Sequence, residues 1–201
     1  MQPAAWERLL EAMLTELDTS GYGEMRVADA LTLAGVSKAD FDAEFPDKDA
    51  CLFAAYEQLT ERLVRRTAAG CGRGGEWPAR VRRGLEALLE ELAGAPEMAR
   101  VAIRTFPAIG PEARARYQDF VEGFAPLLRE GRELAESDGE LPDEVEMLAV
   151  GAAEAIVFEE IEAGRAEQLP AMAPAILFSI LVPFLGPEAA SAEMARAQQA
   201  R

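Results

Sequence analysis

The stretch GVSKADFDAEFPDK, residues 35–48, has the spacing of the recognition helix in a helix-turn-helix DNA-binding unit. Gly35 supplies a turn, Ser37 is placed to cap a short helix, and Pro46 cannot extend that helix. A recognition helix works by contacting phosphates and base edges. Three carboxylates share this helix, however: Asp40, Asp42 and Glu44. The segment therefore predicts the shape of a recognition helix, whereas its acidic side chains oppose contact with DNA.

Cations that would offset these acids are few. The two lysines of the chain, Lys38 and Lys48, bracket the helix, and Arg26 precedes it. Two interpretations of Lys38 stay open: contact with a phosphate, or an ion pair with Asp42 four residues later. The carboxylate of Asp40, in the first helical turn, favours the helix dipole and has a structural explanation. Asp42 and Glu44 have no such structural explanation.

Other reactive chemistry is sparse. The absence of histidine removes the usual general base and metal ligand, so we expect no enzyme, no cofactor and no metal site. The run GCGRGG, residues 70–75, matches a dinucleotide-binding pattern, but a predicted helix precedes it instead of a strand, so we interpret it as an interhelical loop. A carboxylate cluster late in the chain is interpreted as a solvated helix face: Glu154, Glu159, Glu160 and Glu162. Cys51 is interpreted as a small core residue and Cys71 as a free thiol.

Apolar residues recur at helical spacing almost throughout, and no segment has the alternation of a strand, so the predicted fold class is all-α. In the acidic helix, Phe41 and Phe45 point to one side, which leaves Ala39 and Ala43 on the other. The predicted helices cover about 3–19, 27–34, 38–45, 47–69, 77–94, 96–106, 111–137, 142–167 and 170–185, with a short amphipathic helix from 187.

The formal charge of −16 predicts a soluble protein repelled by anionic membranes. No secretory signal opens the sequence, and two cysteines are too few for a secreted disulfide scaffold. The apolar run 175–185 is about half of the roughly 20 residues that a bilayer span requires, so we expect a buried helix. We expect a cytoplasmic location and no membrane partner.

Two further sets of residues are candidates for binding surfaces. Aromatic residues of the middle helices are candidates for an effector pocket, although aromatic residues at helical spacing also build cores: Trp77, Phe106, Tyr117, Phe120 and Phe124. Few polar groups lie among them, so a hydrophobic effector is expected. Small and apolar residues of the last helices predict a homodimer interface, with an internal core helix as the alternative: Gly151, Ala152, Ala155, Ile176, Ile180 and Phe184. Pro183 is expected to bend the last long helix.

The stretches GYGEMRVADALTLAGVS, KADFDAEFPDKDACLFAAYE and EAGRAEQLPAMAPAILFSILVPFLGPE resemble the tetracycline-repressor (TetR/AcrR) family of transcriptional regulators. The resemblance implies a helix-turn-helix domain at 1–47 and a larger effector-binding and dimerisation domain at 48–201. It also implies a dimeric repressor that binds operator DNA and is released by a small effector. The DNA-contacting positions would be Arg26, Ser37, Lys38, Ala39, Asp42, Ala43 and Lys48. The alternative is a ligand-binding or protein-interaction dimer of this fold that has lost DNA binding.

Overall fold

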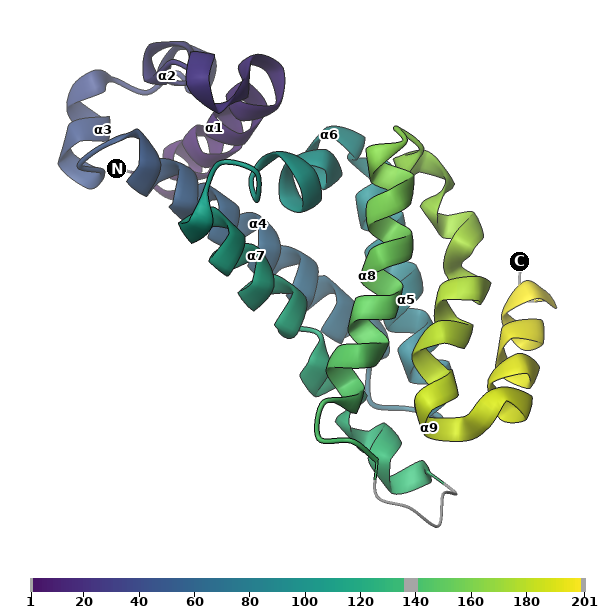
Figure 1. The fold of residues 1–201 in the computed structure, drawn as a ribbon. Helices are drawn as coiled ribbons and strands as arrows, with labels where there is room; N and C mark the ends of the chain where they lie inside the picture. The colour runs from purple at the N-terminus through teal and green to yellow at the C-terminus, as the bar shows by residue number, and fades with distance from the viewer. Residues whose placement is uncertain (1, 136–140, 200–201) are drawn as a thin grey trace. The chain divides into compact units, whose positions relative to one another are not determined.

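The structure, a computed structural model, describes residues 2–135 and 141–199, and these residues form helices and connecting segments without a strand. The expected all-α class is confirmed. The elements, traced in Figure 1, are α1 (Pro3–Glu24), α2 (Val27–Ala34), α3 (Lys38–Glu44), α4 (Lys48–Cys71), α5 (Trp77–Gly94), α6 (Pro96–Arg100), the π-helix η1 (Val101–Thr105), α7 (Pro111–Glu122), the 3-10 helix η2 (Ala125–Leu134), α8 (Val145–Glu162), the 3-10 helix η3 (Ala166–Gln168) and α9 (Leu169–Gln199).

The chain packs into two compact units. Unit 1 consists of residues 1–61 and 97–117, and unit 2 consists of residues 62–96 and 118–201. The helices α4 and α7 each contribute residues to both units. The predicted boundary at residue 47, between a helix-turn-helix domain and an effector-binding domain, concerns function and not packing. It stays a prediction.

Unit 1 is built on the apolar face of α1, where Leu9, Met13 and Leu17 are completely enclosed. This face packs against α2 and η1. An aromatic layer lies in the same unit, where the Tyr56 ring stacks on Phe106 with 3.6 Å between ring centroids. The Tyr56 hydroxyl donates to the carbonyl of Ala102 at 2.8 Å, so the one polar atom of this layer is satisfied.

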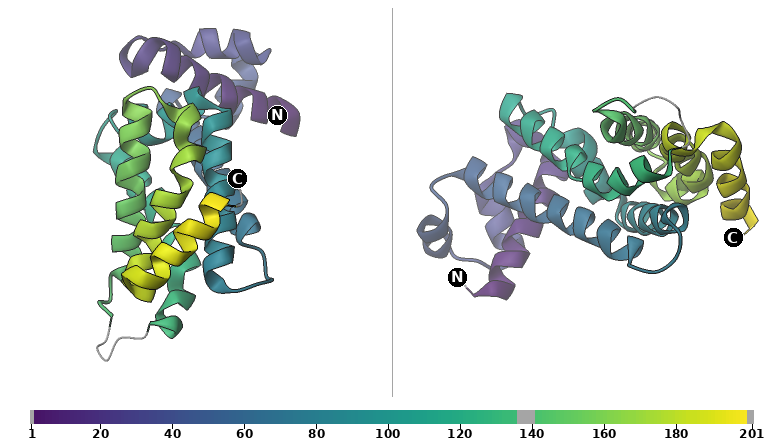
Figure 2. Two further views of the ribbon diagram at one scale, coloured as in Figure 1. Left: turned by 90° about the vertical axis from the view of Figure 1, so that its right-hand side faces the viewer. Right: turned by 90° about the horizontal axis from the view of Figure 1, so that it is seen from below.

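Unit 2 is a helical layer in which α5, α8 and the first part of α9 lie side by side, as Figures 1 and 2 show. Its core consists of apolar residues from all three helices, among them Leu89, Val157 and Leu177. The crossing of α4 and α5 is close because glycines face it: a Cβ at Gly84 would meet the Cys71 sulfur inside contact distance and the Thr67 carbonyl oxygen at 3.0 Å.

Some of the predicted helix boundaries differ from the structure. The predicted helix 96–106 is α6 followed by the wider turn η1, and the predicted helix 111–137 gives way after Glu122 to the 3-10 helix η2. The break in α9 occurs at Gly186, with φ of 75°, which lies between the predicted helices 170–185 and 187 onward and which glycine adopts without a steric penalty. Cys71 is the last residue of α4 instead of a loop residue.

Among the residues that the structure describes, Glu146, in the first turn of α8, has a buried carboxylate. Arg132 of η2 pairs with it through two bonds, one of them 2.7 Å long, and also donates to the carbonyl of Asp143 at 2.7 Å. The hydrogen bonds from Arg132 hold the pKa of Glu146 below its usual range. The pair therefore joins η2 to α8.

Replacing this acid should make stability less dependent on pH. A depressed pKa means that the carboxylate stabilises the fold above its unfolded-state pKa and that this contribution is lost as pH falls through the folded-state value. Glu146→Gln should therefore lower the free energy of unfolding by about 1–2 kcal/mol at pH 7 and by less at acid pH. Urea denaturation at both pH values measures the loss of stability. Glu133→Gln is the control, because Glu133 is an exposed residue of η2. Equal losses at both pH values would contradict the assignment.

Candidate nucleic-acid interface and effector region

The turn between α2 and α3 has the geometry that its sequence predicts. Gly35 adopts the left-handed conformation, with φ of 65° and ψ of 38°, and the Val36 N–H donates to the Leu31 carbonyl at 3.0 Å. The Ser37 hydroxyl then accepts from the Asp40 N–H at 3.1 Å and donates to the Asp40 carboxylate at 2.6 Å. This N-cap by Ser37 starts α3, and the Asp40 carboxylate binds the capping hydroxyl, so Asp40 has a structural role in the first turn.

The inner face of α3 is fixed by aromatic packing. Phe41 and Phe45 are buried, with 5.7 Å between their ring centroids, and Trp6 of α1 stacks on Phe45 at 4.8 Å. The expected inward direction of both phenylalanines is confirmed. Because the helix is anchored on this side, its other side is held outward.

The outer face of α3 is exposed at all the positions that would contact DNA. These exposed residues are Ser37, Lys38, Ala39, Asp40, Asp42, Ala43 and Glu44. Five of the seven predicted contact residues lie on this short segment, and the segment also exposes three carboxylates, those of Asp40, Asp42 and Glu44. A carboxylate about 4 Å from a phosphate is repelled by about 1 kcal/mol in water and about 4 kcal/mol at an interface-like effective dielectric.

The lysines that flank this helix already have partners within the protein. Lys38 forms an ion pair with Asp42, which is one of the two interpretations open from the sequence. Lys48 donates to the Tyr22 carbonyl at 3.0 Å and lies 4.1 Å from the centre of the Tyr22 ring. Arg26 is exposed next to the start of α2. The outer face of α3 is therefore more acidic than the number of nearby lysines suggests, because both lysines are already engaged within the protein.

Tyr22 is a residue that sequence reasoning missed. Its hydroxyl donates to the Asp49 carboxylate at 2.9 Å, and this bond together with the charge of Asp49 raises the Tyr22 pKa. Tyr22 thus contacts two residues at the start of α4: its carbonyl and ring contact Lys48, and its hydroxyl donates to Asp49. The only signal in the sequence is an aromatic residue beside Gly21, which does not reveal a contact across 26 residues.

The predicted effector-pocket residues fall into separate aromatic clusters. In unit 2, Trp77 packs edge to face on Phe184 at 5.3 Å, and Phe120 packs on Phe124 at 5.2 Å. Phe106 belongs to unit 1, where it stacks on Tyr56, and Tyr117 is half-buried in the same unit. One polar atom stands out: the indole N–H of Trp77 is buried without a hydrogen-bond partner among the described residues.

Gly131 allows the Trp77 ring its position, since a Cβ there would lie 2.6 Å from the indole and 2.8 Å from Phe184. The cluster around Trp77 is therefore a close-packed core as the structure stands. Phe124 and Tyr117, by contrast, keep part of their surface accessible. The effector-pocket assignment stays a prediction.

The predicted dimer surface separates into two groups of residues. Gly151, Ala152 and Ala155 lie on the accessible side of α8, near Leu148, whose exposed fraction is 62%. Ile176, Ile180 and Phe184, in contrast, are enclosed by the chain itself, with exposed fractions of 0%, 7% and 2%. The accessible side of α9 presents other residues at helical spacing: Ala171, Ala175, Phe178 and Val182.

The remaining candidate features have structural partners. The carboxylate of Glu160 accepts two bonds of 2.8 Å from Arg165 and is largely buried, whereas Glu159 and Glu162 of the same predicted cluster are exposed. A helix precedes the glycine-rich loop at residues 72–76, where Arg83 donates to the carbonyls of Cys71 and Gly74. Both cysteines are free, and burial raises the pKa of the Cys51 thiol to about 12.

Solved structures with the same fold are transcription regulators. No family model matches the chain. The fatty acid degradation regulator FadR from Bacillus halodurans superimposes with a TM-score of 0.76 at 16% identity, over 88% of this chain and 97% of that one. FadR from Bacillus subtilis, solved in complex with stearoyl-CoA, gives 0.73 at 17% identity, over 89% and 97%. A TetR family regulator from Marinobacter aquaeolei VT8 gives 0.64 at 19% identity, over 85% and 93%. The chain has a TetR-like fold.

Proposed function

We propose that this protein is a TetR-like one-component transcriptional regulator that binds operator DNA as a homodimer and acts as a repressor released by a small, hydrophobic effector. Residues 1–47 would form the DNA-binding domain, and residues 48–201 the effector-binding and dimerisation domain. The observation that carries the proposal is the capped α2–α3 unit, with its exposed outer face, within a TetR-like fold. The protein would have no catalytic role and would work in the cytoplasm.

Fluorescence anisotropy with the DNA upstream of the protein's own gene tests this function. Saturable binding below about 1 µM dimer, with weaker binding to unrelated DNA of equal length, is expected for an operator-binding protein. The titration is run at several salt concentrations, because each phosphate contact adds to the salt dependence. No binding at micromolar dimer in roughly 50 mM salt would exclude the repressor.

A second candidate function is favoured by the charge of the outer face of α3. Asp42 and Glu44 are exposed there, and Lys38 and Lys48 are engaged within the protein. In this alternative, the protein is a ligand-binding or protein-interaction dimer that keeps the fold but has lost operator binding. Absence of DNA binding together with an intact dimer and effector binding would select this candidate.

A hydrophobic effector is supported by two observations. Phe120 and Phe124 supply apolar surface in unit 2, where the side chain of Phe124 stays partly accessible. The similar Bacillus subtilis regulator was solved with stearoyl-CoA. Thermal unfolding with stearoyl-CoA, with coenzyme A and with stearate separates recognition of the apolar chain from recognition of the polar carrier. A stabilisation by coenzyme A alone would contradict a hydrophobic effector.

Dimerisation is proposed through α8 and the accessible side of α9. Leu148, Ala152 and Ala155 follow one another at spacings of four and three residues, so they line one side of α8. The small side chains of Ala152 and Ala155 would let a partner helix approach closely. Gly151 lies beside them, whereas Ile176, Ile180 and Phe184 would support this face from inside the protomer.

A charged residue on this surface should separate the subunits. Leu148→Glu should weaken dimerisation about tenfold or more, because the dimer would bury an unpaired carboxylate. Leu33→Glu is a matched control, since Leu33 is also 62% exposed but lies on α2. Sedimentation equilibrium at micromolar concentration measures the difference. Equal effects of the two substitutions would show that the dimer forms elsewhere.

A further inference from the structure

The 3-10 helix η2 lies within unit 2, where it packs against α5, α8 and α9. Its N–H groups bond to carbonyls three residues back, and at its start the Leu127 N–H donates to the Phe124 carbonyl at 3.0 Å. Such hydrogen bonds have poorer geometry than those of an α-helix, and 3-10 runs longer than about four residues are uncommon. A run of 10 residues therefore depends on its contacts with the rest of unit 2 more than on its own hydrogen bonds.

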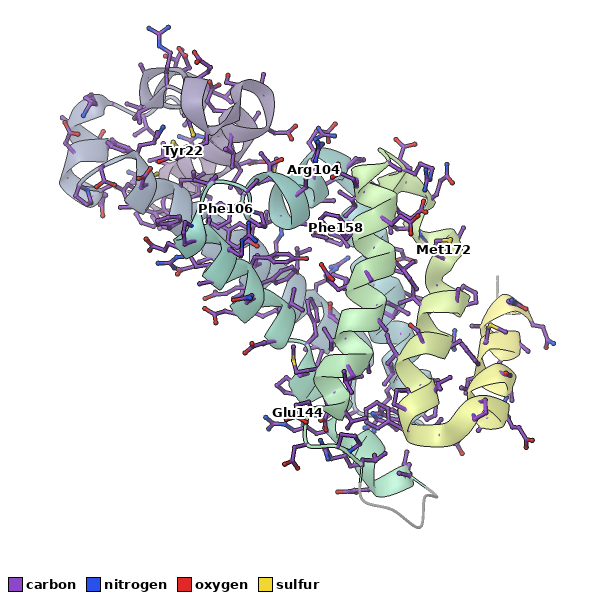
Figure 3. The ribbon with its side chains drawn as sticks, viewed as in Figure 1. Tyr22, Arg104, Phe106, Glu144, Phe158 and Met172 are labelled. Atoms are coloured by element: carbon purple, nitrogen blue, oxygen red, sulfur yellow. The ribbon has the colours of Figure 1, made fainter. Side chains whose placement is uncertain are left out.

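Two ion pairs, the tethers of η2, supply part of that support. Arg80 of α5 pairs with Glu130 of η2. Arg132 of η2 pairs with the buried Glu146 of α8, as described above. Glu144, labelled in Figure 3, directly precedes α8 and marks the end of the helix to which this second tether is attached. Each tether can be removed by a single substitution.

Gly131 lies between the two tethers and allows η2 to sit directly on the aromatic core. A Cβ at this position would lie 2.6 Å from Cζ2 and Cη2 of the Trp77 ring and 2.8 Å from Phe184, so no side chain fits there. Leu128, three residues earlier and thus on the same side of a 3-10 helix, is buried as well. The inner side of η2 therefore covers the ring of Trp77.

This covered position leaves polar atoms unsatisfied. Trp77 is 4% exposed, and its indole N–H has no hydrogen-bond partner among the residues that the structure describes. Because Nε1 belongs to the same edge of the indole as Cζ2, this donor lies close to η2. Nε of Arg80, on the same helix as Trp77, is also buried without a partner in the described part of the chain. Since buried unpaired donors cost free energy, the position of η2 is less stable than its close packing suggests.

We propose that η2 is a strap that is closed over Trp77 in this structure and opens to admit an apolar ligand with an oxygen acceptor to the Trp77–Phe184 cluster. The tethers hold the strap closed, whereas its 3-10 geometry and the unpaired donors favour opening. Once the strap is open, the indole N–H would donate to the oxygen of the ligand. The ligand rests on the proposed function, because it gives the hydrophobic effector a place in unit 2. The movement of η2 does not rest on it.

Hydrogen–deuterium exchange of the full chain without ligand tests the movement. Glu130→Gln and Glu146→Gln each weaken one tether and should speed exchange of the η2 amides about tenfold, because a charge-assisted hydrogen bond is lost. Glu133→Gln is the matched control, since Glu133 is an exposed residue of η2 that belongs to neither tether. Exchange in the middle of α9 should stay unchanged. Equal acceleration throughout unit 2 would mean general loss of stability and would overturn the strap.

Fluorescence tests whether Trp77 is the residue that the strap covers. In a Trp6→Phe background, Trp77 is the one remaining tryptophan. Weakening either tether should raise acrylamide quenching of Trp77 several-fold. Gly131→Ala should shift its emission to longer wavelength, because the added methyl group keeps η2 from its closed position, and Gly94→Ala, which meets no atom within 4 Å, should not. Unchanged quenching and emission in all these variants would overturn the strap.

Ligand binding is measured by the same fluorescence with two neutral probes of similar length, octan-2-one and 1-chlorooctane. Glu130→Gln should bind octan-2-one about tenfold more tightly than the unmodified chain does, although it is less stable, because less free energy is needed to open the strap. The gain should be smaller for 1-chlorooctane, which has no oxygen, and an equal gain would overturn the role of the indole N–H. If neither probe binds while exchange and quenching respond, the movement of η2 is supported and the hydrophobic effector is excluded.

Discussion

Replacing Asp42 by Asn and Glu44 by Gln should raise the affinity of the protein for DNA by about 100-fold or more in roughly 50 mM salt. Each carboxylate removed abolishes a repulsion of about 1 kcal/mol in water, and more at an interface, and a dimer loses four of them. About 1.4 kcal/mol corresponds to a tenfold change in affinity. Asp42→Asn has a further effect, because it releases Lys38 from its ion pair.

Neither substitution should disturb the fold. Both side chains lie on the outer face of α3, whereas the cap at Ser37 and the packing of Phe41 and Phe45 hold the helix in place. Amides of the same size keep the shape and remove only charge. Fluorescence anisotropy with operator-length DNA, both upstream and unrelated in sequence, measures the gain.

The control must change the net charge equally without changing α3. Glu133→Gln with Glu188→Gln does this, since both side chains are exposed in unit 2. Only a small rise in affinity is expected from it. If the two double variants gained equally, total charge would be the cause, and the acidic face of α3 would have no special role.

Gly84→Ala should lower the free energy of unfolding by about 2–3 kcal/mol, which reverses the usual benefit of alanine in a helix. The added methyl group would meet the Cys71 sulfur and the Thr67 carbonyl of α4, and a backbone carbonyl cannot move aside without moving the helix. Urea denaturation followed by far-UV circular dichroism measures the change.

Gly94→Ala is the matched control, because Gly94 ends the same helix and a Cβ there meets no atom within 4 Å. It should leave stability unchanged or slightly higher. Adding Cys71→Ala to Gly84→Ala should recover part of the loss, since the sulfur is one of the two obstacles. No recovery would place the whole effect on the Thr67 carbonyl and contradict a role for Cys71 in the crossing.

The local features of unit 1 could be predicted from the sequence because each is encoded within a few residues. Glycine, as at Gly35, is the residue type that suits a left-handed turn, and serine, as at Ser37, is one of the few types that suit a helix N-cap. Phe41 and Phe45, four residues apart, fix which side of α3 faces the core. These are short-range rules, and the structure follows them.

The features that the sequence did not reveal depend on contacts between residues distant in sequence. The Tyr22 partners lie 26 and 27 residues away, and no local pattern announces them. The aromatic residues expected in one pocket belong to different clusters because periodicity gives the buried side of a helix but not its neighbour. For the same reason, periodicity did not show which side of α9 the chain itself covers, so Ile176 and Phe184 were expected at a dimer surface although they are buried.

If the protein binds operator DNA as proposed, the acidic outer face of α3 would affect how it finds that DNA in the cell. A regulator with a basic surface spends most of its time on non-operator DNA and finds its site by sliding along it. A surface that repels phosphates lowers the affinity for every sequence, so most copies of this protein would remain in solution. An operator would then be found by direct collision, and the concentration of free regulator would nearly equal its total concentration. Occupancy of the operator would therefore respond directly to the number of protein copies, without chromosomal DNA acting as a buffer.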